Sequence, residues 1–458
     1  MNEIIVIGGG LAGSEAALQI AERKIKVKLF EMKPNKFSGA HSNRNLGEIV
    51  CSNSFKSNLL TNACGLLKEE LRILGSFLIP IADKVAVPAG QALAVDREKF
   101  AEEVTKAVEN NEYIKVIREE VTKIPDDSIV VVATGPLTSE GLSKEILRIT
   151  GENKLFFYDA ASPIIEKDSI DMDIAFYGNR YDEERGKEEE ELKWRERIKD
   201  IDASYINLPM NKEEYDNFVK ELISAEVVLL HDFEKREIFE GCMPVEIMAS
   251  RGVDTLRFGP LKPVGFTDPR TGRRPYAVVQ LRQDNSEGIL YNMVGFQTNL
   301  KYGEQKRVFS MIPGLENANF VKYGVMHRNT YINSPKLLDN TYRLRGKNIF
   351  FAGQLTGVEG YVESIASGYV ASKNAIKLFE MLRDNSMKKY EDEKLVYPNE
   401  TIIGALATYI STDRECFQPM NANFGIIPEL SEKIKDKKER YQKFADRSLN
   451  LIKKISVR

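Results

Sequence analysis

The sequence predicts an α/β fold in which a Rossmann-like, dinucleotide-binding domain is interrupted by an inserted α+β domain. Residues 1–31 read as strand, glycine-rich turn, helix and strand, which is one βαβ half of a doubly wound sheet. A strand pattern of the same style returns much later, at 347–353. A chain of 458 residues is too long for one ordinary domain. These features together predict a first domain that resumes after an insertion.

The N-terminal unit is defined by the spacing of its apolar residues. Residues 3–7 form a short apolar run that ends in glycines, which is typical of a buried strand. Residues 11–23 carry apolar side chains at helical spacing, and residues 25–31 read as a second strand. The unit therefore has the order that a dinucleotide-binding fold requires.

The rest of the chain alternates between loop, helical and extended patterns. A polar stretch at 40–65 predicts a loop, and Thr134-Gly135-Pro136 stops a strand at 128–133. Residues 250–300 alternate apolar and polar side chains between turns, which predicts a β-rich segment. The charged stretch at 181–200 predicts a solvated helix or surface excursion. Helices are predicted at 65–75, 96–109, 210–225, 361–380 and 433–458.

These elements divide the chain into three parts. We expect the first part of the dinucleotide-binding domain at 1–168 and the inserted domain at 169–320. The second part of the dinucleotide-binding domain, with a C-terminal helix, is expected at 321–458.

Composition excludes several classes of protein. The net charge of −3 excludes a globally basic nucleic-acid coat protein, although a local basic patch is compatible with it. No apolar run approaches the roughly 20 residues that span a bilayer, and no signal peptide is expected. The cysteines are too few and too scattered for a disulfide framework, which predicts a reducing, cytoplasmic setting. Neither the cysteines nor the three histidines (His41, His231 and His327) have metal-ligand spacing, so no metal is expected.

The segment Gly8-Gly9-Gly10-Leu11-Ala12-Gly13 contains Gly-x-Gly-x-x-Gly between a strand and a helix. Gly8 permits the tight turn, Gly10 lets the backbone approach a pyrophosphate, and Gly13 allows close packing of helix on strand. The free N–H groups of the helix N-terminus then face the phosphates. Glu31, 18 residues after Gly13, is placed to accept hydrogen bonds from the ribose hydroxyls.

Two further segments favour FAD over NAD as the bound dinucleotide. Residues 130–135 resemble the strand-to-turn segment that passes near the cofactor in two-domain flavoproteins. Residues 350–354 resemble their late strand, which leads to a helix aimed at the flavin. Gln354 stands where these flavoproteins usually have Asp, and it can bond the ribityl chain only as a neutral group. The expected contacts to FAD are Gly8, Gly9, Gly10, Leu11, Ala12, Gly13, Glu31, Gly135, Gly353, Gln354 and Gly360.

Two of the four cysteines lie in unusual settings. Cys51 sits among Ser and Asn residues in a predicted loop, where donors could stabilise a thiolate. Cys242 follows a glycine and precedes Met-Pro, which does not suit a helix interior. Cys64 and Cys416 are expected to be buried and inert.

The stretch from Arg251 to Arg282 is strongly basic, with seven basic residues against two acids. The aromatic residues Phe258, Phe266 and Tyr276 are interleaved with the cations. Such a patch suits a nucleic-acid backbone or a polyanion such as a polyglutamylated folate, and the alternative is an ordinary charged surface.

Long blocks of the chain closely resemble the bacterial folate/FAD-dependent tRNA (uracil-5-)-methyltransferases. The resemblance runs almost from end to end and is far more specific than a glycine motif. The blocks include EIVCSNSFKSN at 48–58, HDFEKREIFEGCMPVEIMASRG at 231–252, DTLRFGPLKPVGFTDPRTGRRPYAVVQLRQDN at 254–285, FFAGQLTGVEGYVESIASG at 350–368 and FQPMNANFG at 417–425.

The resemblance implies a cytoplasmic enzyme that methylates the uridine at position 54, in the T-loop of tRNA. The carbon would come from 5,10-methylenetetrahydrofolate, and FAD reduced by NADH or NADPH would provide the hydride. Cys51 and Cys242 match the two catalytic cysteines of the family. We expect Cys51 to add to C6 of uracil and Cys242 to help remove the C5 proton, although the reverse assignment stays open.

The resemblance also suggests contacts outside the dinucleotide site. Folate is expected to stack on the flavin near residues 357–364, with Tyr361 as a contact. Weaker candidates for substrate contacts are Arg282, Asn299, His327 and Arg328. The loop at 41–47 lacks the Asp and the aromatic residue that the family more often has there.

Three alternative functions stay open. The same chemistry could act on ribosomal RNA. A related, longer flavoprotein modifies wobble uridines with a GTPase partner, but the block around Cys242 and the FQPMNANFG block argue against it. A non-catalytic, flavin-bearing RNA-binding protein would need neither Cys51 nor Cys242.

Overall fold

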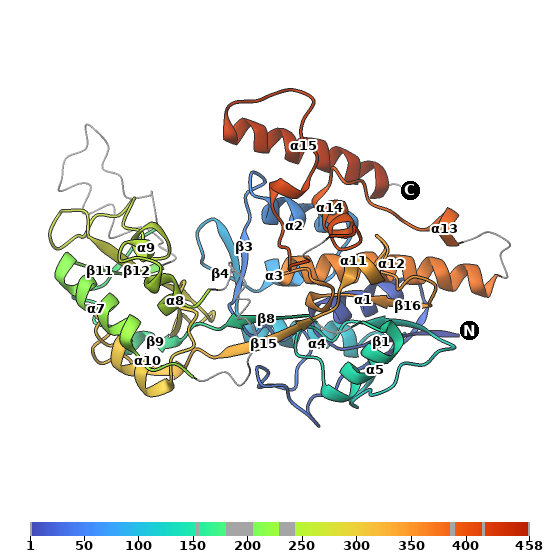
Figure 1. Ribbon diagram of the computed structural model, residues 1–458, viewed down its shortest axis with the longest axis horizontal. Coiled ribbons are helices and arrows are strands. Elements are labelled where there is room, and N and C mark those ends of the chain that lie inside the picture. Colours follow the sequence, from blue (N-terminus) through green and yellow to red (C-terminus); the bar gives the residue numbers. More distant parts are fainter. Residues whose placement is uncertain are drawn as a thin grey trace.

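The computed structural model describes residues 2–152, 155–179, 205–228, 243–384, 390–414 and 417–456. For residues 155–160 and 326–328 it describes the backbone only. The chain forms two lobes joined by a pair of long strands, with both termini in the larger lobe (Figure 1). The charged stretch predicted at 181–200 lies outside the described residues.

A five-stranded parallel sheet forms the centre of the larger lobe, which we call the first lobe. Its strand order is β16-β7-β1-β2-β6, so the strands run 3-2-1-4-5 along the chain when counted from the β6 edge. This is the order of a doubly wound dinucleotide-binding fold, and it confirms the predicted fold class. The strands are β1 (Glu3–Ile7), β2 (Lys26–Phe30), β6 (Ile114–Ile117), β7 (Ile129–Val132) and β16 (Ile349–Phe351).

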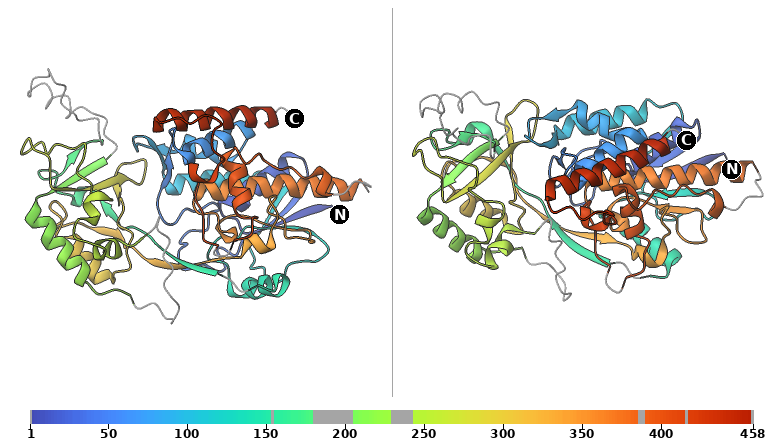
Figure 2. Two further views of the ribbon diagram at one scale, coloured as in Figure 1. Left: turned by 45° about the horizontal axis from the view of Figure 1, so that its top comes forward. Right: turned by 90° about the horizontal axis from the view of Figure 1, so that it is seen from above.

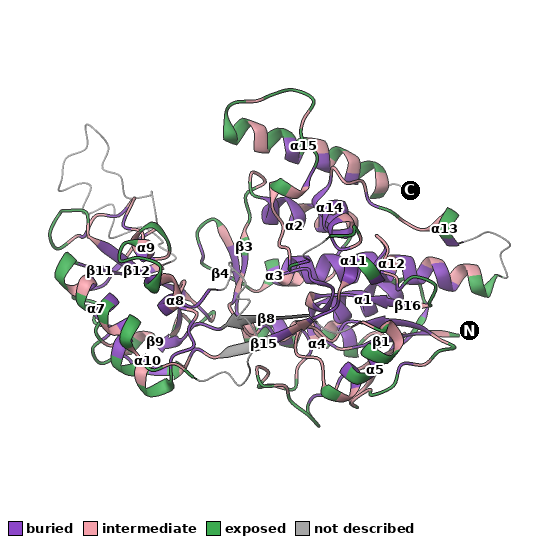
Figure 3. Cartoon of the chain, viewed as in Figure 1, coloured by how far each residue is buried: buried purple, intermediate pink, exposed green. Residues whose placement is uncertain are grey.

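Two buried helices pack against each other beside this sheet. α1 (Leu11–Glu22) and α12 (Tyr361–Arg383) are rich in small residues, so their backbones can approach closely. A Cβ added at Gly368 of α12 would lie 2.2 Å from the carbonyl oxygen of Ala12. Figure 3 shows that α1 and most of α12 are buried. Other helices of this lobe are α2 (Ala63–Leu74), α3 (Leu78–Lys84), α4 (Arg97–Glu109), α5 (Glu140–Thr150), α11 (Ser334–Leu337), α13 (Tyr390–Glu393), α14 (Ile402–Tyr409) and α15 (Lys437–Ser456).

A small antiparallel sheet, in the order β3-β5-β4, takes β3 from the segment predicted as loop and its other two strands from residues 86–95. β3 (Ser54–Ser57) pairs with β5 (Ala92–Val95), which also pairs with β4 (Ala86–Val87). The prediction of a continuous loop over 40–65 is therefore wrong at β3, because pairing with a distant strand stabilises a stretch whose own sequence is polar.

A six-stranded antiparallel sheet, in the order β10-β11-β12-β13-β9-β14, forms the centre of the second lobe. Alternate residues of β12 (Ala277–Gln283) face opposite sides. Ala277, Val279 and Leu281 pack into the core under α7 (Lys212–Ser224), α8 (Val245–Ser250) and α10 (Tyr302–Phe309), whereas Gln280 and Arg282 face away from it. The remaining elements are β9 (Ile164–Glu166), β10 (Phe176–Tyr177), β11 (Tyr205–Met210), β13 (Leu290–Met293), β14 (Phe320–Lys322) and α9 (Thr255–Phe258).

The strands β8 (Leu155–Ala160) and β15 (Met326–Tyr331) form an antiparallel pair between the two lobes. The views in Figure 2 show this pair passing from one lobe to the other. The predicted domain boundaries at 168/169 and 320/321 stay a prediction.

Neither a membrane-spanning helix nor a cluster of metal-binding side chains is found among the described residues. Within the ranges given above, no helix is both long enough and apolar enough to cross a membrane. The same residues contain no group of three or more His, Cys, Asp and Glu side chains that could hold a metal ion.

Candidate active site

A cleft runs across the carboxyl edge of the parallel sheet. Every one of the five strands ends at it, because the residues that follow β6, β2, β1, β7 and β16 all contribute to its walls. Five strands at about 4.8 Å spacing give this edge a width of roughly 19 Å. The volume of the cleft is about 1110 Å³ with its open mouth included. Of the predicted dinucleotide contacts, those that line the cleft are Gly8, Gly10, Leu11, Ala12, Glu31, Gly135, Gly353 and Gln354. Tyr361, predicted to lie where folate stacks on the flavin, lines the cleft as well.

The three glycines of the motif differ in what surrounds them. A Cβ on Gly13 would lie 1.8 Å from the carbonyl oxygen of Gly8, so this glycine is required for the packing of α1 on the turn. Gly8 has φ +103°, a conformation that favours glycine. A Cβ on Gly10 would meet nothing within 4 Å. Gly10 therefore leaves open space beside the N-terminus of α1, where a pyrophosphate can approach the free N–H groups.

Glu31 is fixed by the backbone around it. Its Oε2 accepts a hydrogen bond from the N–H of Gly9 at 2.9 Å, and its Oε1 accepts one from the N–H of Lys33 at 2.9 Å. Each carboxylate oxygen can accept a further hydrogen bond, so Glu31 is pre-positioned for a vicinal diol. Gly9 thus acts through Glu31 and is not itself among the cleft-lining residues.

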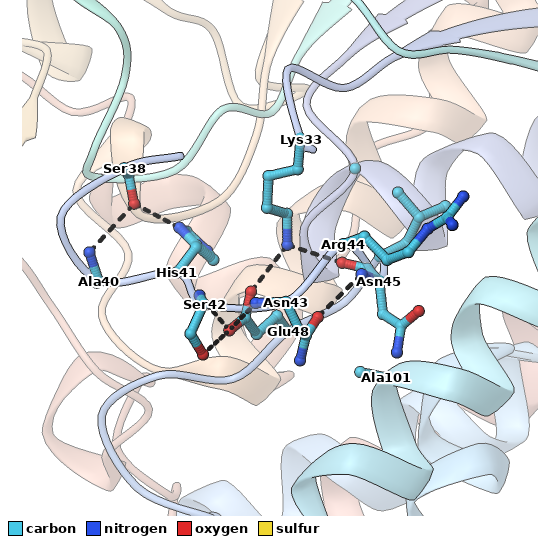
Figure 4. A network of polar contacts seen from close by, with 12 residues as sticks. Lys33, Ser38, Ala40, His41, Ser42, Asn43, Arg44, Asn45, Glu48 and Ala101 are labelled. Carbon is cyan, nitrogen blue, oxygen red and sulfur yellow. Dashed lines mark hydrogen bonds and ion pairs between the residues drawn. The ribbon is translucent and has the colours of Figure 1, made fainter. Parts of the chain in front are cut away.

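A partly buried polar network lies in the loop after β2 (Figure 4) and contributes Lys33, His41 and Glu48 to the wall of the cleft. The Lys33 ammonium donates to Glu48 at 2.9 Å and to the carbonyl of Asn45 at 2.7 Å. Burial acts to raise the pKa of Glu48, but hydrogen bonds from Ser42 and Lys33 outweigh it and hold this pKa below its ordinary value. Burial and the Lys33 charge lower the pKa of His41, so its imidazole is neutral at pH 7.

Sequence reasoning did not identify Lys33, His41 and Glu48 as cleft residues, although all three line it. The only local signal was their position after the second strand, next to Glu31. The contacts that bring Glu48 back to Lys33 depend on the path of the loop, which the sequence pattern does not specify.

The late strand β16 delivers a second set of residues to the cleft. The Gln354 side-chain nitrogen donates to both carboxylate oxygens of Glu359 at 2.7 Å. Gly360, with φ +124°, precedes α12, and its added Cβ would lie 2.1 Å from Glu363 Oε2. The first turn of α12 then places Tyr361 on the cleft wall. The N-terminal end of a long helix therefore points at the cleft, which favours an anionic group there.

Cys51 lies in the loop that Tyr361 supports. The Tyr361 hydroxyl accepts hydrogen bonds from the N–H of Cys51 at 2.9 Å and of Ser52 at 3.1 Å. Burial raises the pKa of Tyr361, so its hydroxyl stays protonated. The thiol is half-buried, and the preceding residue Val50 lines the cleft together with Tyr361.

Two arginines donate hydrogen bonds to the Cys51 loop, and both connect it to the second lobe. Arg282 donates to Asn53 Oδ1 at 2.9 Å and to the Ser52 hydroxyl at 3.2 Å. Arg97 pairs with Asp284 at 3.0 Å and donates to the Val50 carbonyl at 3.3 Å. Arg97 Nη2 is buried and has no hydrogen-bond partner among the described residues. A buried donor without a partner is costly, which is typical of a site that receives a ligand.

The other predicted residues lie elsewhere or outside the description. Asn299 is in the second lobe, where its side chain donates to the Val228 carbonyl at 3.0 Å. His327 and Arg328 lie on β15, and their side chains are not described. Cys242 and Cys416 lie outside the described residues. Cys64 is buried, and burial raises its pKa to about 11, which agrees with the prediction of an inert thiol.

Comparison with known proteins identifies the family. A family model described as glucose inhibited division protein A matches residues 3–382. A relative from Listeria monocytogenes serotype 4b, named methylenetetrahydrofolate–tRNA-(uracil-5-)-methyltransferase TrmFO, is 55% identical over 99% of both chains. A relative of the same name from Acetivibrio thermocellus is 57% identical over 99% of this chain and 98% of its own. The chain belongs to the TrmFO family.

Membership of the TrmFO family confirms the resemblance seen in the sequence. A solved structure of Aquifex aeolicus GidA matches 99% of this chain at a TM-score of 0.68 and 18% identity. That likeness concerns the fold alone, and it covers 73% of the GidA chain. The TrmFO-family chain is therefore similar in fold to a longer protein and similar in sequence to relatives of its own length.

Proposed function

We propose that this chain methylates C5 of the T-loop uridine at position 54 of tRNA, with 5,10-methylenetetrahydrofolate as the carbon donor. Relatives that are 53–57% identical over almost their whole length carry the name of this activity. The observation that carries the proposal is the half-buried thiol of Cys51, held by Tyr361 next to the cleft.

FAD is the dinucleotide that we propose for the cleft, and the residues fit it. The open space at Gly10 admits a pyrophosphate, Glu31 suits a ribose, and the cleft continues past both to Gln354 and Tyr361. When bound and reduced by NADH or NADPH, FAD would supply a hydride. Gln354 would meet the cofactor as a neutral group, already oriented by Glu359.

Cys51 is proposed as the nucleophile. C5 of uracil is a poor nucleophile until its ring is activated, and addition of the Cys51 thiolate to C6 converts the ring to an enolate. The C6–S bond forms while the π bond between C5 and C6 is lost, and the negative charge moves to the carbonyl oxygen at C4. Arg97 lies beside the loop with a buried donor that has no described partner, and we propose that it stabilises this charge.

The remaining protein roles concern proton transfer and release. Once the one-carbon unit is joined to C5, a base must remove the C5 proton, and the sequence resemblance assigns Cys242 to assist. Loss of that proton, with cleavage of the bond between the one-carbon unit and the folate nitrogen, would leave an exocyclic methylene at C5 and release tetrahydrofolate. Once the hydride that reduced FAD would supply has completed the methyl group, release of Cys51 from C6 would restore the planar pyrimidine. The assignment of the two cysteines can be reversed, which single variants distinguish.

The proposed partners and location follow from the same assignment. The T-arm of tRNA and a folate are the proposed substrates. The residues proposed to lie near them are Tyr361, Arg282, Asn299, His327 and Arg328. Arg282 supports the Cys51 loop through Ser52 and Asn53, so we propose a positioning role for it. The cytoplasm is proposed as the location because folate, nicotinamide cofactors and tRNA occur together there.

The experiment is a transfer assay with purified, yellow enzyme, unmodified tRNA transcript, NADPH and methylenetetrahydrofolate labelled in the one-carbon unit. We expect labelled 5-methyluridine in the T-loop. Label found only in ribosomal RNA offered in parallel would redirect the substrate. Absence of label in both RNAs, from enzyme with a full complement of flavin, would indicate the non-catalytic, RNA-binding alternative.

A further inference from the structure

Phe258, the last residue of α9, is 82% exposed. No other large apolar side chain among the described residues is exposed to this degree, and the next is its near neighbour Val253 at 59%. A single exposed apolar residue needs no explanation in itself. Phe258 is distinguished by the fixed position of its helix and by the positive charges around it.

The helix that carries Phe258 is fixed on its other sides. Leu256 is fully buried in the core of the second lobe. The Arg257 guanidinium lies 3.6 Å above the ring of Tyr276 and also donates to the Tyr276 carbonyl at 3.1 Å. Arg257 further pairs with Asp254 at 2.7 Å. These contacts fix α9, so the Phe258 side chain extends from an ordered backbone. Little conformational entropy is therefore lost at this helix when a ligand binds.

The surroundings of Phe258 are positively charged. Both acids of the stretch from Arg251 to Arg282 are neutralised internally, since Asp254 pairs with Arg257 and Asp268 pairs with Arg270. Arg273 and Arg274 are exposed, and neither forms an ion pair with another described residue. Arg274 lies two residues before Tyr276, so its Cα is within roughly 7 Å of the residue on which Arg257 stacks.

Strand β12 connects this surface to the candidate active site. It begins directly after Tyr276, and near its other end Arg282 bonds the neighbours of Cys51. Six residue steps along a strand span roughly 20 Å. That distance equals about six stacked nucleotides at 3.4 Å each, so one folded RNA arm can contact both ends of the strand.

We propose that Phe258, with Arg273 and Arg274, forms a second RNA contact, in which the ring stacks on an unpaired base and the two arginines bind flanking phosphates. An aromatic ring set among cations is the combination that recognises unstacked nucleotides. The polyglutamate tail of a folate could bind the two arginines, but it has no planar group that would stack on the Phe258 ring. The inference rests on the proposed function, because it takes the RNA whose uridine reacts at Cys51 as the ligand.

The test measures binding of unmodified tRNA transcript to the flavin-loaded protein, together with kcat and KM for methyl transfer. Phe258→Ala should weaken RNA binding by about 5- to 150-fold, the range for loss of one stacking contact. Phe258→Trp should restore binding, and the control Val253→Ala should change it less than twofold. The value of kcat at saturating RNA should be unchanged, because Phe258 does not line the candidate active-site cleft.

Salt dependence separates the ring from the arginines. Replacement of both Arg273 and Arg274 by Gln should reduce the slope of log K against log salt by about 2, whereas Phe258→Ala should leave the slope unchanged. RNA binding by Phe258→Ala at the wild-type level would overturn the inference, and so would a defect seen only with polyglutamylated folate. If the wild type binds RNA through Phe258 but transfers no methyl group, the proposed function fails while the contact stands.

Discussion

Tyr361, which lines the cleft, supports the backbone of the Cys51 loop through its hydroxyl. Its hydroxyl oxygen accepts two backbone N–H groups, one from Cys51 and one from Ser52. Because a hydroxyl has two acceptor lone pairs, both contacts are satisfied by one atom. One oxygen atom of α12 therefore fixes two consecutive peptide groups of the Cys51 loop.

Tyr361→Phe should lower methyl transfer without loss of flavin. The variant keeps the ring on the cleft wall but leaves two N–H groups without an acceptor, a cost of about 1–3 kcal/mol for each group that stays buried. We expect kcat to fall by about 10- to 100-fold while the flavin absorbance per protein stays at the wild-type level. Wild-type kcat in this variant would show that the Cys51 loop is held by other contacts.

Arg97 offers a second test at the residue scale. Arg97→Lys keeps a positive charge that can reach Asp284, but it loses the fork of donors that includes Nη2. If Nη2 stabilises charge on the pyrimidine, kcat should fall by about 100- to 1000-fold, with RNA binding unchanged. The matched control is Lys99→Arg on the exposed side of α4, which should leave kcat unchanged. A similar kcat for both variants would exclude the role proposed for Arg97.

At the scale of the element, two glycines of the turn between β1 and α1 have different roles: Gly13 is needed for folding and Gly10 for cofactor binding. Gly13→Ala would force a methyl group against the Gly8 carbonyl and move α1, whereas Gly10→Ala meets open space at an ordinary φ of −76°. Gly13→Ala should therefore lower stability by about 1–3 kcal/mol. Gly10→Ala should unfold at the wild-type temperature but bind flavin at least about tenfold more weakly, because its methyl group occupies the pyrophosphate approach.

Thermal unfolding and the flavin-to-protein ratio, measured on the same preparations, check this pair. Full flavin binding by Gly10→Ala would contradict the position assigned to the pyrophosphate. An unchanged unfolding temperature for Gly13→Ala would contradict the close packing of α1.

Glu70 makes the docking of α14 and α15 dependent on pH. Its buried carboxyl accepts from the N–H groups of Ile402 and Ile403, both at 2.8 Å, and from the Ser448 hydroxyl. Burial raises the pKa of Glu70 from 4.5 to about 7. The folded state therefore binds this proton more tightly than the unfolded state, and the stability it contributes is lost as pH rises from about 4.5 to about 7.

That loss corresponds to about 3 kcal/mol. Urea unfolding at pH 5 and pH 7.5 covers most of this range and should show that the free energy of unfolding of Glu70→Gln changes with pH by about 2 kcal/mol less than that of the wild type. Glu102→Gln, a change of an exposed side chain on α4, serves as the control and should follow the wild type. Equal pH dependence in the wild type and Glu70→Gln would show that the carboxyl does not titrate in this range.

At the scale of the whole molecule, the two lobes meet at the Cys51 loop. Asn53 donates to the Gln283 carbonyl at 2.9 Å, and Arg282 donates one hydrogen bond to Asn53 and one to Ser52. Arg97 and Asp284 form an ion pair between the same two lobes. These contacts are buried, so removal of one partner leaves a polar group unsatisfied. The second lobe thereby helps to position a loop that belongs to the first.

Arg282→Met tests this connection. The variant keeps the apolar length of the side chain but removes the donors to Ser52 and Asn53. We expect methyl transfer to fall at least about tenfold while flavin binding is retained, since Arg282 lies outside the dinucleotide cleft. Loss of flavin together with activity would instead indicate that the fold of the first lobe depends on Arg282.

Local patterns predicted the parts of the molecule that local sequence determines. The strands β1 and β7, the glycine turn and the helix α12 follow from short apolar runs and small residues, and their order fixed the dinucleotide cleft. The family resemblance singled out Arg282 as a candidate substrate contact, but local patterns in the basic stretch did not show that Arg282 is buried and Phe258 exposed. Arg282 is buried because it lies on one face of β12, and Phe258 is exposed because α9 packs on the second lobe through its other side chains. Both arrangements depend on contacts between segments that are distant in the sequence.

The most direct test of the central claim is covalent capture of the RNA. In a tRNA transcript made with 5-fluorouridine, fluorine replaces the C5 hydrogen, so no proton can leave C5 and an enzyme that attacks C6 should stay attached to the RNA. The wild type should give an adduct stable in a denaturing gel, with the RNA mapped to the peptide that contains Cys51, and Cys51→Ala should give none. An unaltered adduct in Cys51→Ala would contradict the account and move the nucleophile to another residue.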